Sequence, residues 1–375
     1  MTCVFMFFLF MIIYSYVVFP GGLFLLTLFV RKPEVKAVGG FRPVVSVIIS
    51  AYNEEAVIEQ KVRNTLDLDY PTDLLEVIVS SDGSTDRTNE IVAGIQDSRL
   101  VLKAFPERAG KTACLNRVVL IARGDVVLFS DANSMYPKDL LEKLAPNFQN
   151  PDIGSVTGWT KYKDPGGGKE KSGLYAWIEK NTKVWESSIS SCVGADGAVF
   201  AMRKSLYRPL QEDDINDFVI PLDVIRQGKR VILDPAVYCV EESSKGMRNE
   251  YNRQVRITTR TLNAIQKNRE FLNPLRYGIF SFFLFSHKVC RFLVPFFLIG
   301  AFLTNLLLLS DSPFYALTLS ALVLVPVAAH MAGRIGLRSR ILDVANLFFV
   351  TAFAHLVGWC RMALGAKDTT WTPQR

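Results

Sequence analysis

The distribution of apolar residues predicts a membrane anchor at the start of the chain. Between residues 3 and 30 the polar residues are all uncharged, and a helix of that length reaches ~40 Å, enough to cross a bilayer. Arg31 and Lys32 follow directly. A cleaved leader would show a basic start, a shorter apolar core and a small-residue cleavage site, and none of these is evident. We therefore predict an uncleaved transmembrane helix over residues 1–32, kinked around Pro20.

A different pattern occupies the middle of the chain, where short β-branched runs alternate with amphipathic stretches. The clearest runs are residues 44–49, 75–79 and 125–129. Nearly continuous apolar runs separated by helical segments are typical of a mostly parallel sheet that is covered on both faces. We predict an α/β domain over residues 33–273, with its ligands beyond the carboxyl ends of the strands.

The end of the chain is again apolar. Three stretches, 292–309, 314–331 and 342–364, are each near or above the ~18 residues that mark a candidate membrane span. The segment before them is too short to span and carries basic residues at its ends, which suits a helix in the membrane interface. The predicted order is an interfacial amphipathic helix at 274–291, a transmembrane region of up to three helices at 292–366 and a tail at 367–375.

Basic residues predict how these spans are oriented. Arg334, Arg338 and Arg340 lie between the second and third stretches, whereas the loop before the second contains no base. The positive-inside rule therefore places the arginine-rich loop in the cytoplasm, in agreement with a cytoplasmic middle domain. With one span before that domain and three after it, however, the tail would lie outside, although Arg361 and Lys367 prefer the inside. Either the rule is weak here or one segment does not cross.

The composition excludes several classes of protein. Of the 375 residues, 49% are hydrophobic and 21% are charged, which is too apolar for a disordered chain or an ordinary cytosolic enzyme. The net charge of +7 fits basic residues beside a membrane better than it fits nucleic-acid binding, because the sequence has no basic low-complexity tail. The six scattered cysteines and the three histidines in or beside apolar stretches argue against a disulfide framework and a Cys/His zinc site.

Acidic turns follow the first two predicted strands. Residues 50–55 include Asn53 and Glu54, which bind a nucleobase or ribose in one interpretation and cap the next helix in the other. Residues 80–86 include Asp82, which either accepts a hydrogen bond from uracil or ribose or belongs to a turn with an N-cap. Two acidic turns at successive strand ends favour ligand binding.

A third strand end carries oxygen ligands for a metal. Asp131 and Asn133 stand at positions i and i+2, so their side chains point to the same side and can hold a hard divalent cation, although such pairs also begin turns. Mg²⁺ or Mn²⁺ there would neutralise the charge on a leaving diphosphate. Lys111 offers phosphate a single positive charge rather than a P-loop, because Phe105 replaces the glycine that a P-loop requires.

Two charged clusters complete the candidate chemistry. Residues 212–217 contain four carboxylates, which are either an acidic helix start or include a general base for an acceptor hydroxyl. Arg253, Arg256 and Arg260 follow i, i+3, i+7 spacing, which places three guanidinium groups on one helical face. That face suits a diphosphate or, in the other interpretation, anionic lipid.

Taken in order, these motifs resemble the family-2 glycosyltransferases, and more narrowly the membrane-embedded polysaccharide synthases related to hyaluronan, chitin, cellulose and poly-N-acetylglucosamine synthases. Residues 51–54 are similar to the family's first nucleotide-binding turn, residues 82–86 to its uridine-binding Asp-Gly-Ser-x-Asp, and residues 108–111 to its Arg-x-Gly-Lys element. The resemblance implies a GT-A-type transferase domain flanked by N- and C-terminal transmembrane helices. It implies nucleotide binding by Ala51, Tyr52, Asn53, Glu54, Asp82, Lys111 and Asp131, and a metal held by Asp131 and Asn133.

The resemblance also indicates the base and the acceptor side. The family's Thr-Glu-Asp aligns best with residues 215–217, because an apolar helix and a Gly-Lys-Arg-Val sequence follow, so Asp217 is the predicted base ahead of Asp213 and Asp214. Asp196 lies in a loop that resembles the one lining the acceptor, or in a tight structural turn. The predicted diphosphate and acceptor contacts are Arg253, Arg256, Asp196 and Trp371.

The function that follows is inverting transfer of a sugar from a UDP-sugar to a growing polysaccharide of the exopolysaccharide or capsule kind, at the plasma (inner) membrane with a cytoplasmic catalytic domain. One alternative is transfer of a single sugar to a lipid or polyprenyl phosphate, because Arg253 and Ile257 stand where the family's Gln-x-x-Arg-Trp has Gln and Trp. The other is a non-catalytic membrane component for binding or transport. The expected partners are the donor, a glycan or lipid-linked acceptor and membrane lipids, with no nucleic acid.

Overall fold

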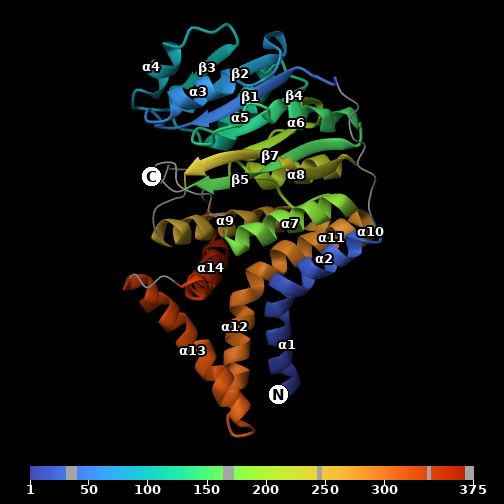
Figure 1. Cartoon of the computed structure of the whole chain (residues 1–375), viewed down its shortest axis with the longest axis vertical. Coiled ribbons are helices and arrows are strands. Elements are labelled where there is room, and N and C mark those ends of the chain that lie inside the picture. The colour runs from blue at the N-terminus through green and yellow to red at the C-terminus, as the bar shows by residue number, and fades with distance from the viewer. Residues whose placement is uncertain (31–39, 164–172, 243–246, 336–338, 368–375) are drawn as a thin grey trace. The chain divides into compact units, whose positions relative to one another are not determined.

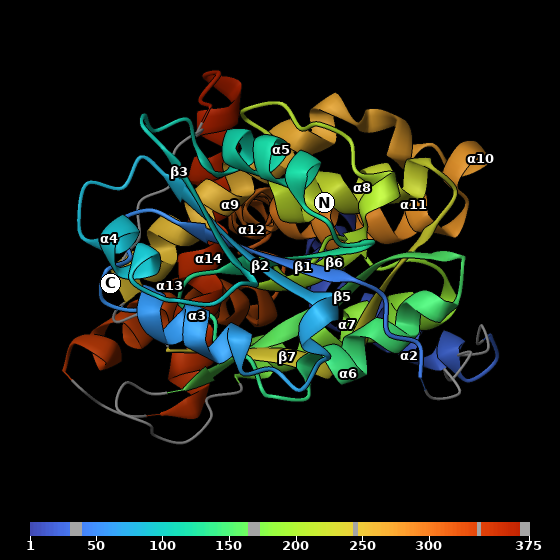
Figure 2. The ribbon, with the colours of Figure 1, turned by 90° about the horizontal axis from the view of Figure 1, so that it is seen from above.

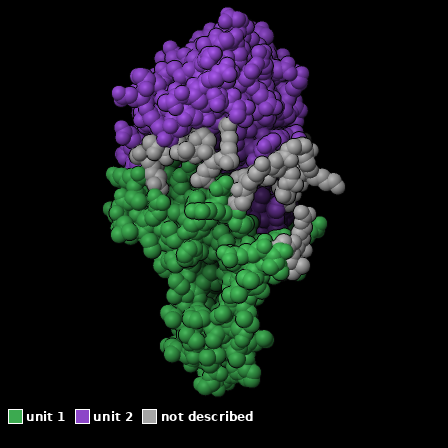
Figure 3. Space-filling model, turned by 90° about the vertical axis from the view of Figure 1, so that its left-hand side faces the viewer, with its two compact units in different colours: residues 1–25, 245–367 green, residues 26–244, 368–375 purple. Residues whose placement is uncertain are grey.

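The chain forms two compact units, residues 26–244 with 368–375 and residues 1–25 with 245–367 (Figure 3). The computed structural model describes residues 1–30, 40–163, 173–242, 247–335 and 339–367. The boundary between the units falls at residues 244–245, earlier than the domain end expected at 273.

Seven strands form one mixed sheet in the unit built from the middle of the chain (Figure 1). Their order is β3-β2-β1-β4-β6-β5-β7. Strand β1 pairs in parallel with β2 and β4, β2 with β3, and β5 with β7, whereas β6 is antiparallel to β4 and β5. The prediction of a mostly parallel sheet is confirmed. The strands are β1 Val45–Ala51, β2 Leu75–Asp82, β3 Leu100–Phe105, β4 Val126–Asp131, β5 Ile153–Lys163, β6 Val199–Arg203 and β7 Arg230–Glu242.

Helices cover both faces of this sheet, as the view from above shows (Figure 2). Alternate β1 residues such as Val47 and Ile49 pack on one face against residues of α3, α4 and α6. On the other face, where α5 and α8 lie, the rings of Phe129 and Phe200 stack with centroids 4.7 Å apart. Burial on both faces explains why the strands are continuously apolar. The helices of this unit are α3 Ile58–Leu66, α4 Thr88–Ala93, α5 Lys111–Ile121, α6 Leu140–Leu144, α7 Leu174–Ile189 and α8 Asn216–Arg226.

The first apolar segment is one long helix with an irregular turn. Helix α1 (Thr2–Ile13) passes through a π-helical turn, Tyr14–Val18, into α2 (Phe19–Thr27). Pro20 has no N–H to donate to the carbonyl of the preceding turn, which accounts for the irregular hydrogen bonding directly before it. The expected kink around Pro20 therefore takes the form of a π turn.

The helices after β7 begin with a polar one and continue with apolar ones. The segment expected as a separate interfacial helix, 274–291, is divided at Gly278, whose φ of +55° interrupts the helix. Beyond it, Ile279–Leu307 forms a single apolar stretch through a second π turn at Phe285–Val289. The helices are α9 Met247–Lys267, α10 Pro274–Tyr277, α11 Ile279–Leu284, α12 Cys290–Leu307, α13 Pro313–Arg334 and α14 Arg340–Ala363.

Within the described residues, four helical stretches are long and apolar enough to cross a membrane: Thr2–Thr27, Ile279–Leu307, Pro313–Arg334 and Arg340–Ala363. The expectation of transmembrane helices at both ends of the chain is thus confirmed by length and composition.

Candidate active site

Three of the predicted turns meet at one edge of the sheet because parallel pairing aligns the carboxyl ends of the strands. Ser50 of β1 lies opposite Ser80 of β2 on one side and Asp131 of β4 on the other. This edge is where α/β sheets bind their ligands. A hollow of about 20 Å³ opens there, lined by Ser50, Ala51, Tyr52, Ser80, Asp82, Lys111, Cys114 and Asp131.

The turn after β1 is joined to the turn after β2 rather than to the next helix. Asn53 has a positive φ of 52°, and its side-chain oxygen accepts a hydrogen bond from the Thr85 backbone N–H at 2.8 Å. Helix α3 begins after Val57 and has no side-chain cap, so the capping interpretation of Asn53 and Glu54 does not hold. Glu54 is buried, and its backbone N–H donates to Thr88 at 2.8 Å, so it lies behind the hollow rather than in it.

Asp82 holds the N-terminus of α5. Its carboxylate accepts hydrogen bonds from the backbone N–H groups of Ala109 at 2.7 Å and Gly110 at 3.0 Å. A carboxylate in this position also interacts favourably with the helix dipole. Gly83 allows the chain before α5 to approach this closely, because its φ is +65° and a Cβ there would lie 2.7 Å from the backbone nitrogen of Arg108. Asp82 therefore joins the end of β2 to the start of α5, and both segments line the hollow.

Lys111 forms an ion pair across the hollow with Asp131, with Nζ and Oδ1 2.6 Å apart. Both side chains are partly exposed, at 22% and 30%. The ammonium of Lys111 therefore lies against the Asp131 carboxylate, which the sequence predicts to be a metal ligand. The donor set also fits a hard cation, since a carboxylate and the amide of Asn133 supply oxygen ligands and phosphates supply more. The described residues contain no cluster of three or more His, Cys, Asp or Glu that would hold a metal alone.

Three residues that line the hollow, Ser50, Ser80 and Cys114, are not among the predicted site residues, and neither is Arg108, which contacts the lining residue Tyr52. Cys114 on α5 donates through Sγ to Asp82 Oδ1 at 3.3 Å, and burial, with Asp82 beside it, raises the pKa of this thiol to about 12. The Arg108 guanidinium lies 3.8 Å from the centre of the Tyr52 ring, in a cation–π contact. Arg108 was recognised only as part of the Arg-x-Gly-Lys element. The position of Cys114, one turn into α5, could have indicated it.

Asp217 lies in the first turn of α8, against the loop that precedes β6. Its backbone oxygen accepts a hydrogen bond from the Ala195 N–H at 2.7 Å, and a Cβ added to Gly197 would lie only 2.9 Å from Asp217 Oδ2. The loop before α8 also contacts α5, because Thr112 Oγ1 donates to the Asp214 carbonyl at 3.0 Å. Asp214 itself is committed to a turn, accepting from the Gln211 N–H at 2.8 Å.

Asp196 stabilises the turn in which it lies. Its carboxylate accepts hydrogen bonds from the Thr160 N–H at 2.9 Å and from the Ala198 N–H at 3.1 Å. These bonds fasten the turn to β5, and they favour the structural interpretation of this residue over direct contact with an acceptor.

The remaining predicted residues are not in the lining of the hollow, belong to the other compact unit or fall outside the described residues. Asn133 is exposed on the turn after β4. Arg253 and Arg256 are on α9, where Arg253 pairs with Glu250 at 3.3 Å. Trp371 falls outside the described part of the chain.

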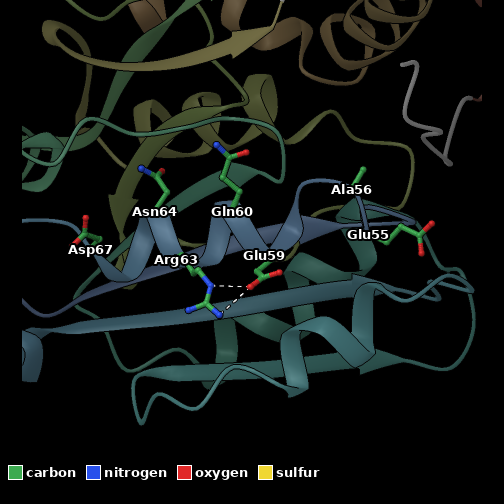
Figure 4. A pocket seen from close by; sticks show the side chains of 7 residues that line it. All are labelled: Glu55, Ala56, Glu59, Gln60, Arg63, Asn64 and Asp67. Carbon is green, nitrogen blue, oxygen red and sulfur yellow. Dashed lines mark hydrogen bonds and ion pairs between the residues drawn. The ribbon is translucent and has the colours of Figure 1, made fainter. Parts of the chain in front are cut away.

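A larger groove of about 630 Å³ runs along the outer face of α3 (Figure 4). It contains an ion pair between Arg63 and Glu59 at 2.9 Å. It is shallow and shares no residue with the hollow, so its size does not make it the site of chemistry. Its lining residues are Glu55, Ala56, Glu59, Gln60, Arg63, Asn64 and Asp67.

Comparison with known proteins identifies the fold and the domain. Residues 46–209 match the family described as Glycosyl transferase family 2. The solved structure of the mannosyltransferase PcManGT from Pyrobaculum calidifontis, in complex with GDP-Man and Mn²⁺, superposes with a TM-score of 0.75 at 21% identity. The superposition covers 97% of this chain and 99% of that one, which shows a shared fold.

Two groups of curated relatives match over shorter lengths. A beta-monoglucosyldiacylglycerol synthase of Synechocystis is 39% identical over 118 residues, which are 30% of this chain and 25% of that protein. A poly-beta-1,6-N-acetyl-D-glucosamine synthase of Staphylococcus aureus is 31% identical over 116 residues, which are 30% of this chain and 28% of that protein. The chain thus matches about a quarter of the length of these relatives. Residues 46–209 of this chain thus match a glycosyl transferase family 2 domain, and its sheet has the GT-A-like fold of the mannosyltransferase structure.

Proposed function

We propose that the protein is a membrane-bound inverting transferase that moves a sugar from a nucleotide-sugar, of the UDP-sugar class, to a growing glycan. The observation that carries this proposal is the convergence of Tyr52, Asp82, Lys111 and Asp131 at the carboxyl edge of β1, β2 and β4. Polar groups that line the crevice beyond parallel strands are suited to a nucleotide. The GDP-Man and Mn²⁺ bound to PcManGT support a nucleotide-sugar donor and a divalent cation.

In this proposal the donor side is a charged pocket that opens when the nucleotide enters. A site for a ligand of this size normally encloses ~300 Å³ or more, so the side chains around the hollow must move. Lys111 would then pair with a phosphate instead of with Asp131, and Asp131 and Asn133 would hold Mg²⁺ or Mn²⁺. The cation would neutralise negative charge on the leaving diphosphate.

Asp217 is the proposed general base. Its carboxylate takes the proton from the acceptor hydroxyl, the hydroxyl oxygen bonds to the anomeric carbon, and the bond to the diphosphate breaks. Because this is one displacement, the configuration at the anomeric carbon inverts. The contact of Asp217 with the loop at Gly197 limits where the carboxylate can lie, which a base requires.

A second candidate function is transfer of one sugar to a lipid acceptor. Two observations favour it: the 39% identical relative is a glycolipid synthase, and Ile257 replaces the tryptophan of the processive motif. The size of the product separates the two functions, since one gives a sugar-lipid and the other a polymer. In both, the enzyme is an integral protein of the plasma (inner) membrane with its catalytic domain in the cytoplasm.

The test is substitution of the base in purified protein in detergent. Asp217→Asn should reduce transfer at least ~100-fold, the usual contribution of a general base, while UDP still binds with Mn²⁺ present. Asp214→Asn is the control, because its carboxylate is committed to the Gln211 turn, and it should transfer at nearly the wild-type rate. Wild-type transfer by Asp217→Asn would show that another acid is the base. If no nucleotide-sugar releases nucleoside diphosphate, the protein is a non-catalytic binding component.

A further inference from the structure

Lys61 lies behind the proposed metal site, in a place where lysine is rarely found. It stands in the second turn of α3, is completely buried and is among the largest fully buried side chains of the protein. Burying an ammonium group is costly unless it is paired and hydrogen-bonded. The partners of Lys61 therefore indicate what the charge is for.

Within the described residues, the short contacts of the Lys61 ammonium are with residues that follow Asp131. Nζ donates to the Ser134 carbonyl at 2.5 Å and lies 3.3 Å from the centre of the Tyr136 ring, in a cation–π contact. Burial lowers the pKa of Lys61 to about 7, and the nearby Cys239, Asp131 and Glu241 act against that shift.

Asn64, one turn further along α3, holds the same segment from the side. Its Nδ2 donates to the Tyr136 carbonyl at 2.8 Å, and its Oδ1 accepts from the Tyr136 N–H, also at 2.8 Å. From the opposite side, Ser134 Oγ donates to Glu241 at 2.5 Å. Residues 131–136, which we call the 131–136 turn, are therefore clamped between the inner face of α3 and strand β7.

The same residues connect the turn to the acceptor side. The Tyr136 hydroxyl donates to the Ala198 carbonyl at 3.0 Å, in the loop where Asp196 and Gly197 lie. Gly197 in turn lies against Asp217. One buried lysine thus supports a turn that reaches both the proposed metal ligands and the loop beside the proposed base.

We propose that Lys61 is a positioning residue that fixes the 131–136 turn, so that Asp131 and Asn133 bind a divalent cation together with a nucleoside diphosphate. This inference rests on the proposed function. Groups that orient a metal ligand without touching the metal typically change metal affinity 10- to 100-fold when they are removed. A lysine that merely filled the core would affect stability and leave metal affinity unchanged.

The experiment measures Mn²⁺ binding by electron paramagnetic resonance in the full-length protein in detergent, with UDP or GDP present. Lys61→Met keeps the aliphatic volume and removes the ammonium, and it should weaken Mn²⁺ binding about tenfold or more. The matched control is Thr65→Val on the same helix, which removes a buried hydroxyl that donates within α3, to the Lys61 carbonyl at 2.9 Å. This variant should bind Mn²⁺ within twofold of the wild type.

A second variant tests the same role in case Lys61→Met does not fold. Asn64→Ala removes the two bonds to Tyr136 from a partly exposed position, and it should weaken Mn²⁺ binding several-fold with the fold retained. Mn²⁺ affinity equal to wild type in Asn64→Ala and in any folded Lys61→Met would overturn the positioning role. If the wild type itself binds no Mn²⁺ with either nucleotide, the proposed function is wrong. The wild-type measurement therefore distinguishes failure of the proposed function from failure of the positioning role, which is tested by the two variants.

Discussion

Asp82 and Asp131 both end parallel strands, yet their carboxylates act differently. Asp82 accepts hydrogen bonds from the backbone at the start of α5, so it organises the pocket. Asp131 pairs with the ammonium of Lys111. Because the lysine side chain is long and flexible, this ammonium can move away and a metal cation can take its place beside Asp131. The sequence predicts the place of both residues, because each follows an apolar run. It does not predict the difference, because the bonds to Asp82 join residues 27 and 28 positions apart.

Asp217 and Gly197 give a prediction about a single methyl group. In Gly197→Ala the new Cβ would lie 2.9 Å from Asp217 Oδ2, so the carboxylate must move away. Since misplacing a catalytic group by ~1 Å can cost 10²-fold, we expect kcat to fall about 10- to 100-fold with UDP affinity nearly unchanged. The measurement is steady-state transfer kinetics together with UDP titration.

The control for that substitution is Gly94→Ala at the end of α4, where the added Cβ meets its nearest atom at 3.4 Å. This variant should keep wild-type kcat. A Gly197→Ala enzyme with wild-type kcat and intact folding would contradict the role of Asp217 as the base.

At the scale of elements, α3 shows how much a local pattern can predict. Its apolar positions predict a helix over a sheet, but its inner face also carries Lys61, whose function depends on the 131–136 turn some seventy residues later in the chain. Its outer face forms the acidic groove in Figure 4. The runs at 44–49, 75–79 and 125–129 are strands β1, β2 and β4, since continuous apolar sequence marks a doubly covered strand.

The sequence does not predict the direction in which β6 pairs or the full length of the helix at 279–307. Strand β6 is antiparallel to both of its neighbours, and this depends on the path by which the chain returns to the sheet, not on the residues of the strand. The apolar helix begins directly after Gly278, because the residues that follow this glycine are apolar and its φ of +55° is not helical. A length criterion applied to residues 274–287 alone could not show this continuity.

Helices α9 and α14 approach each other closely enough for a test of packing. A Cβ added to Gly358 of α14 would lie 2.7 Å from Thr258 Cγ2 of α9. Gly358→Ala should therefore force the helices apart and lower the free energy of unfolding by about 1–3 kcal/mol, the usual cost of overpacking. The measurement is thermal unfolding of the purified protein in detergent.

Gly333→Ala on α13 is the matched control, because its added Cβ would meet Asn346 only at 3.6 Å, an ordinary contact. Replacing glycine inside a helix without a clash stabilises it by about 0.5–1 kcal/mol. If both variants changed stability in the same direction, the close approach of α9 and α14 would not be the cause.

At the scale of the whole molecule, the contacts of α14 bear on the number of membrane crossings. Tyr251 stacks on Phe353 with centroids 6.0 Å apart, Thr258 lies against Gly358, and Asn263 Nδ2 donates to the Ala366 carbonyl at 3.0 Å. These contacts advance together along both helices, so α9 and the second half of α14 run side by side. The arginines and lysines of α9 exclude it from the hydrocarbon of a bilayer.

We therefore expect the second half of α14 to lie in the membrane interface beside α9, although its length and composition would allow it to cross. Three candidate crossings would then remain: Thr2–Thr27, Ile279–Leu307 and Pro313–Arg334. With three crossings, Lys367 would lie on the same side of the membrane as the middle domain of the chain. This topology would remove the conflict between the span count and the basic residues near the end of the chain, since Arg361 and Lys367 would then lie inside.

Cysteine labelling in sealed, oriented membrane vesicles tests this topology. In a background in which Cys3 and Cys360, the exposed cysteines of the described residues, are replaced by serine, single cysteines are introduced as Lys103→Cys in β3, Asp311→Cys between α12 and α13, and Lys367→Cys after α14. A membrane-impermeant maleimide should label Lys103→Cys and Lys367→Cys from one side and Asp311→Cys from the other, because one helix crosses between positions 103 and 311 and a second crosses between 311 and 367. Labelling of Lys367→Cys from the side of Asp311→Cys would mean that α14 crosses after all, and that its contacts with α9 are not made in the membrane.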